Sequence, residues 1–251
     1  MKKSFFIAMV LFIIAVPVLN AVTFKKYSGE RAFYLPEETS NWDDDEIKVH
    51  EVHRYEIDFP IDGTNQLKAA ILNSVFGVKN TSNLNDAAER FLNTFLIEES
   101  QSSSKLVNYI PEDGFYTYLS YVSGKLISQT SDLIVYKSGS YLYFAGAARG
   151  ENAVSHINFY IPSQKTLTIF DLLLRSKEAA ISKVVTRNAS KVLGYEVENI
   201  YVSEKFYLSS KGITFVYNPW EIGQGNEVIE ITVPKSQLAG SLTPLGEKII
   251  K

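Results

Sequence analysis

The stretch FYLSSKGITFVYNPWEIGQGNEVIEITVPKSQLAGSL, residues 206–242, decides the fold that we predict for this chain. Within it, residues 213–217 form a run of β-branched and aromatic side chains that breaks at Asn218-Pro219. A second alternating run covers residues 227–233, and a short helical piece is expected to begin near Ser236. Two such runs joined by a polar, glycine-containing loop predict neighbouring strands of one sheet.

Three segments show the apolar spacing of amphipathic helices. The first is expected to begin at residues 64–65, where Thr or Asn can act as the N-cap, and to end at Gly77. The second covers residues 84–99, with apolar side chains on one stripe and charged ones on the other side. The third covers residues 176–193 and is expected to end at a glycine.

Other parts of the chain alternate with a period of two, which is typical of strands. Residues 48–59 and several runs within residues 106–161 have this pattern, and Gly/Ser turns are expected at residues 123–125 and 137–140. Short strands joined in this way predict an antiparallel meander whose edges the helices cover. We therefore predict an α+β fold, an antiparallel β-sheet with helices packed on one side, made of two intimately joined α/β segments.

The amino terminus has the pattern of a secretory signal peptide. Lys2 and Lys3 precede an almost unbroken apolar run over residues 5–19, and Ala21 provides a small residue for cleavage. The run is shorter than the ~20 residues that span a bilayer, so we expect cleavage near Ala21 and export to the periplasm or the extracellular space. Retention of the leader as a membrane anchor is the alternative.

The same patterns give an expected domain organisation. Val22 begins a mixed polar stretch that we interpret as a tether or an edge segment. The expected parts are a signal peptide over residues 1–21, an N-terminal tether over residues 22–44, a small α/β segment over residues 45–104 and a C-terminal domain over residues 105–251.

The composition limits the kinds of partner and of membrane attachment that we expect for this protein. The chain has 251 residues, 45% of them hydrophobic, and a formal net charge of −3. No basic stripe runs through the sequence, so we expect no nucleic-acid partner. Cysteine is absent, which excludes acylation at a lipoprotein cleavage site and leaves stability to the core alone.

Catalytic and metal-binding motifs are absent from the sequence. It contains no G-x-S-x-G elbow, no G-x-G-x-x-G loop and no paired metal-ligand motif. The histidines are His50, His53 and His156, and strand alternation places the first two on opposite faces. We interpret all three as ordinary surface or edge residues and expect no metal and no cofactor. The acidic run at residues 43–46 is interpreted as a solvated turn.

The loop after the first run carries a resemblance to a known family. The sequence YNPWEIG at residues 217–223, followed by VPKSQL at residues 233–238, resembles the extracytoplasmic RsiV-like domain family. Residues 143–150 and 159–173 resemble further segments of that family, so the resemblance covers roughly residues 105–242. Arg149 stands where many members have His, and Gln164 stands where they usually have Gly.

The best understood members of that family sense lysozyme as membrane-tethered anti-sigma factors or lie beside a peptidoglycan deacetylase domain, and most members have no assigned activity. The resemblance therefore implies a cell-envelope binding module whose partner is an envelope or host protein, lysozyme-like, or a peptidoglycan fragment. It does not imply a catalytic activity. Contact with a membrane is expected only through an uncleaved leader.

Two loops carry the candidate contact residues, because exposed aromatic and Arg side chains are favoured at binding surfaces. The alternative is that the Trp side chain fills the core and that both loops only close the sheet. A carboxylate-dependent enzyme acting on envelope glycans is the second hypothesis, in which Glu221 is the first suspect although its loop position equally suits a structural hydrogen bond. The candidate binding residues are Trp220, Glu221 and Gln224 in one loop and Arg149 and Glu151 in the other.

Overall fold

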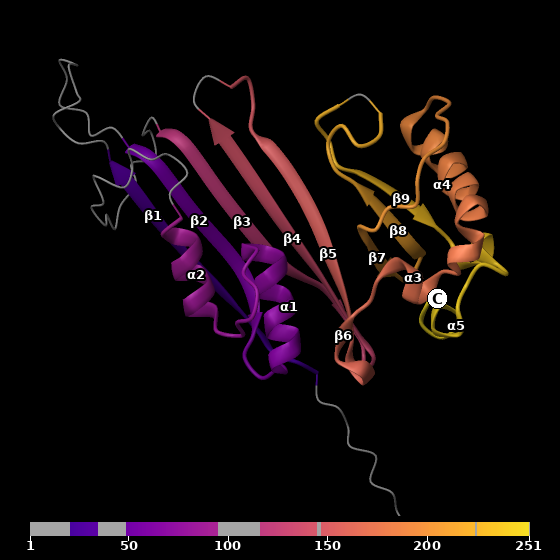
Figure 1. Ribbon diagram of the computed structural model, residues 1–251, viewed down its shortest axis with the longest axis horizontal. Coiled ribbons are helices and arrows are strands. Elements are labelled where there is room, and N and C mark those ends of the chain that lie inside the picture. The colour runs from indigo at the N-terminus through magenta and orange to yellow at the C-terminus, as the bar shows by residue number, and fades with distance from the viewer. Residues whose placement is uncertain (1–20, 35–48, 95–115, 145–146, 224, 251) are drawn as a thin grey trace, which may run out of the picture.

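The computed structural model describes residues 21–34, 49–94, 116–144, 147–223 and 225–250 (Figure 1). Residues 1–20 of the expected signal peptide, the acidic run at residues 43–46 and the expected segment boundary at residues 104–105 lie outside these ranges. None of the helices in the described ranges is long and apolar enough to cross a bilayer.

The strands form two sheets. The larger sheet has the order β1-β2-β3-β4-β5-β6, and it is antiparallel except for the parallel pair β2–β3. The smaller sheet is antiparallel with the order β7-β8-β9. The strands are β1 (Phe24–Tyr34), β2 (Val49–Pro60), β3 (Tyr116–Gln129), β4 (Leu133–Phe144), β5 (Glu151–Tyr160), β6 (Lys165–Thr166), β7 (Phe206–Ser209), β8 (Gly212–Tyr217) and β9 (Ile229–Val233).

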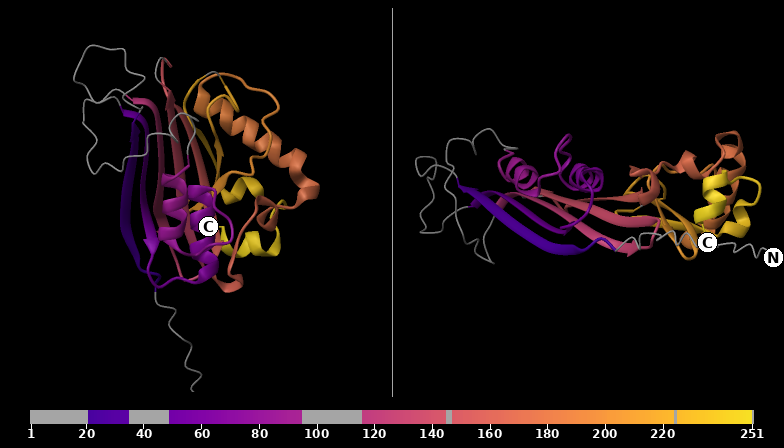
Figure 2. Two further views of the ribbon diagram at one scale, coloured as in Figure 1. Left: turned by 60° about the vertical axis from the view of Figure 1, so that its left-hand side comes forward. Right: turned by 90° about the horizontal axis from the view of Figure 1, so that it is seen from below.

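Helices cover one face of the larger sheet and pack around the smaller one (Figures 1 and 2). In the view from below in Figure 2, α1 and α2 both lie on the same side of the larger sheet. The α-helices are α1 (Asn65–Phe76), α2 (Leu84–Leu92), α3 (Ile169–Leu172), α4 (Glu178–Leu193) and α5 (Pro244–Ile249), and the 3-10 turns are η3 (Ile161–Ser163), η4 (Arg175–Lys177) and η5 (Lys235–Leu238). The predicted α+β class is confirmed, and the parallel β2–β3 pair makes the larger sheet mixed.

The expected end of the second helix near residue 99 is wrong, because α2 ends at Leu92, where the Asn93 side chain donates to the Glu89 carbonyl. Other helix ends lie where capping chemistry was expected to place them. The Thr64 hydroxyl accepts a hydrogen bond from the backbone N–H of Leu67, and Gly77 closes α1 with a φ of 69°. Gly194 closes α4 in the same left-handed conformation, with a φ of 77°. These positions were predictable because Gly adopts positive φ without the clash that a Cβ creates.

Two of the predicted turns are wrong, because β3 continues through Gly124 and β4 continues through Gly139. The connecting turn lies instead at residues 130–132. A Cβ at Gly124 would lie 2.1 Å from the Tyr136 hydroxyl oxygen, so the glycine makes room for a buried ring. Glycine inside a strand here marks a close approach of a neighbouring side chain and not a chain reversal.

The interpretation of the histidines as surface or edge residues is wrong for His53. His53 is fully buried on the interior strand β2, with Nε2 2.7 Å from the Glu51 carboxylate. His156 is half-buried beside the Tyr207 ring, and its burial, with a smaller contribution from Lys137, lowers its pKa to about 4. Alternation alone could not reveal this burial, because α2 covers His53 and β7 covers His156. The side chain of His50 lies outside the description.

Residues 22–34, the first part of the expected tether, include an edge strand. Of the two interpretations of this stretch, tether or edge segment, the structure selects the second, because β1 pairs with β2 along its length. The larger sheet thus takes β1 and β2 from before the expected boundary and the other four strands from after it.

One buried amide joins the two sheets. Asn158 on β5 is 1% exposed, and its Nδ2 donates to the Phe206 carbonyl at 2.8 Å while its Oδ1 accepts from the Leu208 N–H at 2.9 Å. The side chain therefore bonds the edge of β7 as a neighbouring strand would. Val135 and Tyr160 of the larger sheet also belong to the core of the smaller unit.

We expect Asn158→Ala to lower the free energy of unfolding by about 2–4 kcal/mol, because two buried backbone groups of β7 would lose their partners. Urea unfolding would measure the change, and Asn152→Ala, at an exposed position of the same strand, is the matched control. A loss no larger than that of the control would show that the amide does not join the sheets.

Candidate functional site

The two candidate loops meet beside the junction of the sheets. Asn218, at the start of the β8–β9 loop, accepts a hydrogen bond through Oδ1 from the Val154 N–H of β5 at 2.8 Å. Further along the loop, the Asn226 Nδ2 donates to the Gly150 carbonyl at 3.5 Å. The tertiary structure thus brings together two loops that are about 70 residues apart in sequence.

The predicted pair Trp220 and Arg149 lies across this junction. The guanidinium carbon of Arg149 is 5.9 Å from the centroid of the Trp220 ring, which is a cation–π distance. Glu151 is exposed at the first position of β5, and Gln224 lies outside the described residues.

Trp220 combines exposure with an unfavourable backbone conformation. Its relative exposure is 65%, and its φ of 68° lies in the left-handed region that favours glycine. Its N–H donates to the Gly225 carbonyl at 3.3 Å, which closes the loop. The alternative that Trp220 fills the core is therefore wrong. The chain keeps a large apolar ring in solvent, although exposure of the ring and the left-handed backbone both cost free energy.

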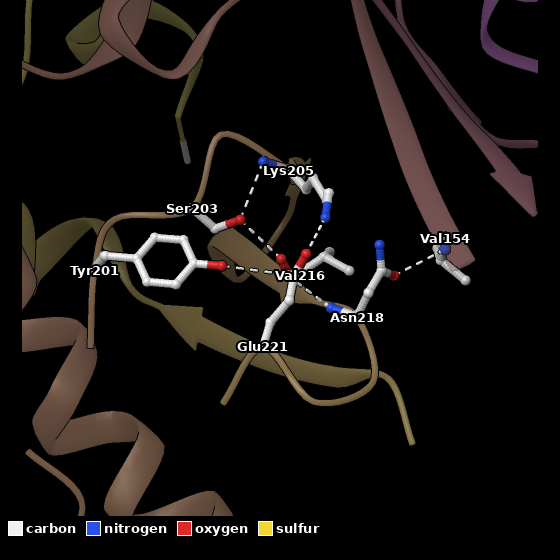
Figure 3. Close-up of polar contacts among 7 residues, drawn as sticks. All are labelled: Val154, Tyr201, Ser203, Lys205, Val216, Asn218 and Glu221. Atoms are coloured by element: carbon white, nitrogen blue, oxygen red, sulfur yellow. Dashed lines mark hydrogen bonds and ion pairs between the residues drawn. The ribbon is translucent and has the colours of Figure 1, made fainter. Parts of the chain in front are cut away.

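Glu221 lies inside a polar frame beneath the loop (Figure 3). Its carboxylate accepts hydrogen bonds from the Tyr201 hydroxyl at 3.2 Å and from the Asn218 N–H at 3.0 Å, and it forms an ion pair with Lys205. The Glu221 N–H in turn donates to the Asn218 carbonyl at 3.1 Å. The carboxylate thus fixes the start of the loop that presents Trp220.

These contacts keep Glu221 ionised. Partial burial by itself raises the pKa of the carboxyl, but the hydrogen bonds from Lys205, Asn218 and Tyr201 outweigh it, so the pKa lies below the ordinary value of 4.5. A general acid needs the opposite shift. The geometry of Glu221 therefore suits a structural role better than proton donation.

The segment before β7 forms the other side of the frame. The Ser203 hydroxyl donates to the Val216 carbonyl at 2.8 Å, and the Tyr217 hydroxyl donates to the Tyr201 carbonyl at 2.6 Å. Tyr201 and Lys205 were not predicted as site residues. No local signal marks them, since their partner Glu221 lies 16 or more residues further along the chain.

Hydroxyl groups on one face of α4 hold the chain that leads to Tyr201. Ser182 donates to the Ile200 carbonyl at 2.6 Å, Thr186 accepts from the Ile200 N–H at 3.0 Å, and Ser190 accepts from the Val197 N–H at 3.1 Å. The spacing of four residues places the three hydroxyls in one row along the helix. They fix the segment between α4 and β7.

Two further exposed rings lie beside the loop. Tyr195 and Tyr201 are each 49% exposed, and a Cβ added at Gly223 would come within 2.8 Å of the Tyr195 hydroxyl oxygen. We name this region the Trp220 surface, and it consists of Trp220, Arg149, Tyr195 and Tyr201. Within the described ranges, no group of three or more His, Cys, Asp or Glu side chains is placed to hold a metal ion.

Comparisons with known proteins identify relatives by structure alone. No protein-family model and no curated protein matches the sequence. A DUF3298-family protein from Bacteroides fragilis NCTC 9343 superposes with a TM-score of 0.68 at 15% identity, over 88% of this chain and 94% of the other. A DUF3298-family protein from Pseudomonas aeruginosa PAO1 gives a TM-score of 0.62 at 16% identity, over 89% and 95%.

At these identities the likeness establishes the fold. The architecture described above is therefore one that DUF3298-family proteins adopt, and it spans nearly the whole length of both neighbours. A shared fold at this level of identity does not carry a binding or catalytic role over to the Trp220 surface.

The backbone at Trp220 gives a test of the strain. We expect Trp220→Gly to be more stable than Trp220→Ala by about 1 kcal/mol, because only Gly adopts the left-handed conformation without a Cβ clash. Urea unfolding of both variants would measure the difference. Val192, which is 57% exposed within α4, is the control, because there the Ala variant should be the more stable one. Equal stability of the two Trp220 variants would contradict the strained conformation.

The frame around Glu221 gives a test of pH dependence. Because the folded-state pKa of Glu221 is depressed, its contribution to stability is present above about pH 4.5 and is lost as the pH falls through the folded-state pKa. Glu221→Gln should therefore lose about 1 kcal/mol at pH 7 and show a smaller further loss than the wild type on acidification. Urea unfolding between pH 7 and pH 3 would measure both, with exposed Glu198→Gln as control. Parallel curves for wild type and Glu221→Gln would contradict the assignment.

Proposed function

We propose that this protein is an exported, non-catalytic binding module of the cell envelope and that the Trp220 surface is its contact site. The observation that carries the proposal is Trp220 itself, 65% exposed and with a φ of 68°. Exposure of a Trp ring and a left-handed backbone at a bulky residue both oppose stability, and strained residues of this kind cluster at functional sites. A ligand that covers the ring would bury its apolar surface and so gain binding free energy.

The surroundings of the ring favour binding. Trp, Tyr and Arg are the residue types enriched at positions that dominate binding energy, and all three occur in the Trp220 surface. The frame beneath it, in which Glu221 bonds Tyr201, Lys205 and Asn218, holds the loop before a ligand arrives. A preorganised loop loses less conformational entropy on binding than a mobile one.

The partner that we propose is an envelope or host protein, lysozyme-like, or a peptidoglycan fragment. This part rests on the sequence motif YNPWEIG and its resemblance to the RsiV-like family, together with the leader pattern at residues 1–21. The DUF3298 neighbours support the fold of the module and leave its finer family assignment to that motif. The enzymatic alternative gains no support from Glu221, whose depressed pKa and three donors do not suit a general acid.

We expect the purified protein to bind lysozyme or purified peptidoglycan saturably, with at least about thirtyfold weaker binding in Trp220→Ala and a clear loss in Arg149→Ala. Biolayer interferometry for lysozyme and co-sedimentation for peptidoglycan would measure the affinities. Ile127→Ala, which removes a 44% exposed apolar side chain on β3, is the matched control and should bind as the wild type does.

Other results would contradict the proposal. Binding that Trp220→Ala leaves unchanged would place the contact elsewhere, and absence of binding to both ligands would remove the proposed partners. Turnover of peptidoglycan that Glu221→Gln abolishes would favour the carboxylate-dependent enzyme.

A further inference from the structure

The edge strand β1 presents a long, regular backbone on its outer side. β1 pairs with β2 from Phe24 to Phe33 in one register, and the shift in register comes only between Phe33 and Tyr34. No other strand within the described ranges pairs with β1 (Figure 1). Its sequence FKKYSGERAFY contains no proline, so every residue of the strand keeps its N–H donor.

The hydrogen-bond pattern shows which peptide groups point outward. The Ile61 N–H donates to the Thr23 carbonyl at 3.0 Å, so these two residues form a hydrogen-bonded pair of the antiparallel ladder. Because such pairs alternate with non-bonded pairs, the next residue, Phe24, turns its N–H and C=O away from β2. Opposite it stands Pro60, which has no N–H to offer. By this alternation Phe24, Lys26, Ser28 and Glu30 turn exposed or half-exposed peptide groups outward, whereas Ala32, the next residue in the series, is fully buried.

Charges on these outward residues are arranged symmetrically about Ser28. Lys26 lies two residues before it and Glu30 two residues after it, and all three side chains are exposed. Each charge already has a partner on β2, since Lys26 Nζ is 2.7 Å from Glu56 and Arg54 Nε is 3.1 Å from Glu30. One half of the edge is thus positive and the other half negative. A second copy of the strand that runs in the opposite direction would place each half beside the opposite charge.

We propose that β1 is a self-association surface, on which a second copy of this chain pairs antiparallel through its own β1, with Ser28 on the two-fold axis. In this register Ser28 exchanges N–H and C=O with its own copy, and the exposed residues two positions to either side do the same with each other across the axis. Lys26 stands opposite the partner's Glu30, and the symmetry repeats that pair. The two larger sheets then form one continuous sheet across the axis.

The register extends the ion pairs that the single chain already has. Across the axis the charges run Glu56, Lys26, then the partner's Glu30 and the partner's Arg54, so neighbouring strands alternate in sign. On the other face, Lys25 stands opposite the partner's Arg31. That guanidinium is already compensated, because Arg31 forms an ion pair with Glu89 at 3.2 Å and is only 14% exposed.

Charged residues on an edge strand normally prevent association, because they meet apolar or like-charged residues of a passing strand. Here the same charges disfavour the registers that place Lys26 or Glu30 opposite its own copy, and the register centred on Ser28 sets each opposite the other charge. This selectivity points to a second copy of the chain as the occupant and disfavours an unrelated extended segment. The surface lies on a different sheet from Trp220, so it is independent of the proposed function.

Charge exchange tests the register. Sedimentation equilibrium of the purified protein should show a monomer–dimer equilibrium, which Lys26→Glu or Glu30→Lys alone weakens about tenfold or more, because two opposite-charge pairs become like-charge pairs. An equimolar mixture of the two single variants should associate again as a heterodimer, and so should the double variant with itself. Lys211→Glu, at an exposed position of the smaller unit, is the charge-matched control and should leave the dimer unchanged.

A crosslink tests the position of the axis. The chain has no cysteine, so an introduced thiol can pair only with its copy. Ser28→Cys should form a disulfide-linked dimer under mild oxidation, because opposed residues on antiparallel strands lie within the Cα separation that a disulfide spans. Ser176→Cys, at an exposed position of the smaller unit, should stay unlinked. A protein that is monomeric at all accessible concentrations, or a dimer that ignores the charge exchange, would overturn the proposal.

Discussion

The amide of Asn158 is the interaction on which the arrangement of this protein depends. It bonds both the Phe206 carbonyl and the Leu208 N–H, and so it continues the larger sheet into the smaller one without a strand between them. Because Asn158 is only 1% exposed, water does not compete for either hydrogen bond. The contact between Trp220 and Arg149 lies beside this junction, where further hydrogen bonds join the two candidate loops.

The Trp220 surface shows how a rigid support can hold an unfavourable side chain. Tyr201, Lys205 and the Asn218 N–H converge on Glu221, and the α4 hydroxyls fix the segment that carries Tyr201 (Figure 3). Such a frame over-determines the loop, which lets Trp220 remain in a left-handed conformation. The same logic separates roles among neighbours: Glu221 stabilises the loop, whereas Trp220 is the proposed contact residue.

The two proposed surfaces differ in the groups that would make contact with a partner. The Trp220 surface offers exposed rings and a guanidinium on loops, where recognition depends on side chains. The β1 edge offers backbone groups in a fixed register, and charges select among the possible registers. The β1 edge is separated from β5, beside which the Trp220 surface lies, by the width of the larger sheet, so occupation of one leaves the other accessible. A dimer through β1 would present two Trp220 surfaces and would raise the effective affinity for a repetitive ligand.

The sequence alone determined the class of the fold, the helix ends at Gly77 and Gly194 and the residue types of the two candidate loops, because capping, periodicity and turn chemistry act over a few residues. Tertiary structure decided the rest. The space that Tyr136 needs made Gly124 part of a strand, and α2 buried His53. The bonds from Asn218 to Val154 and from Asn226 to Gly150 brought the two candidate loops together. Contacts between residues distant in sequence set these outcomes, and one sequence carries no local signal of them.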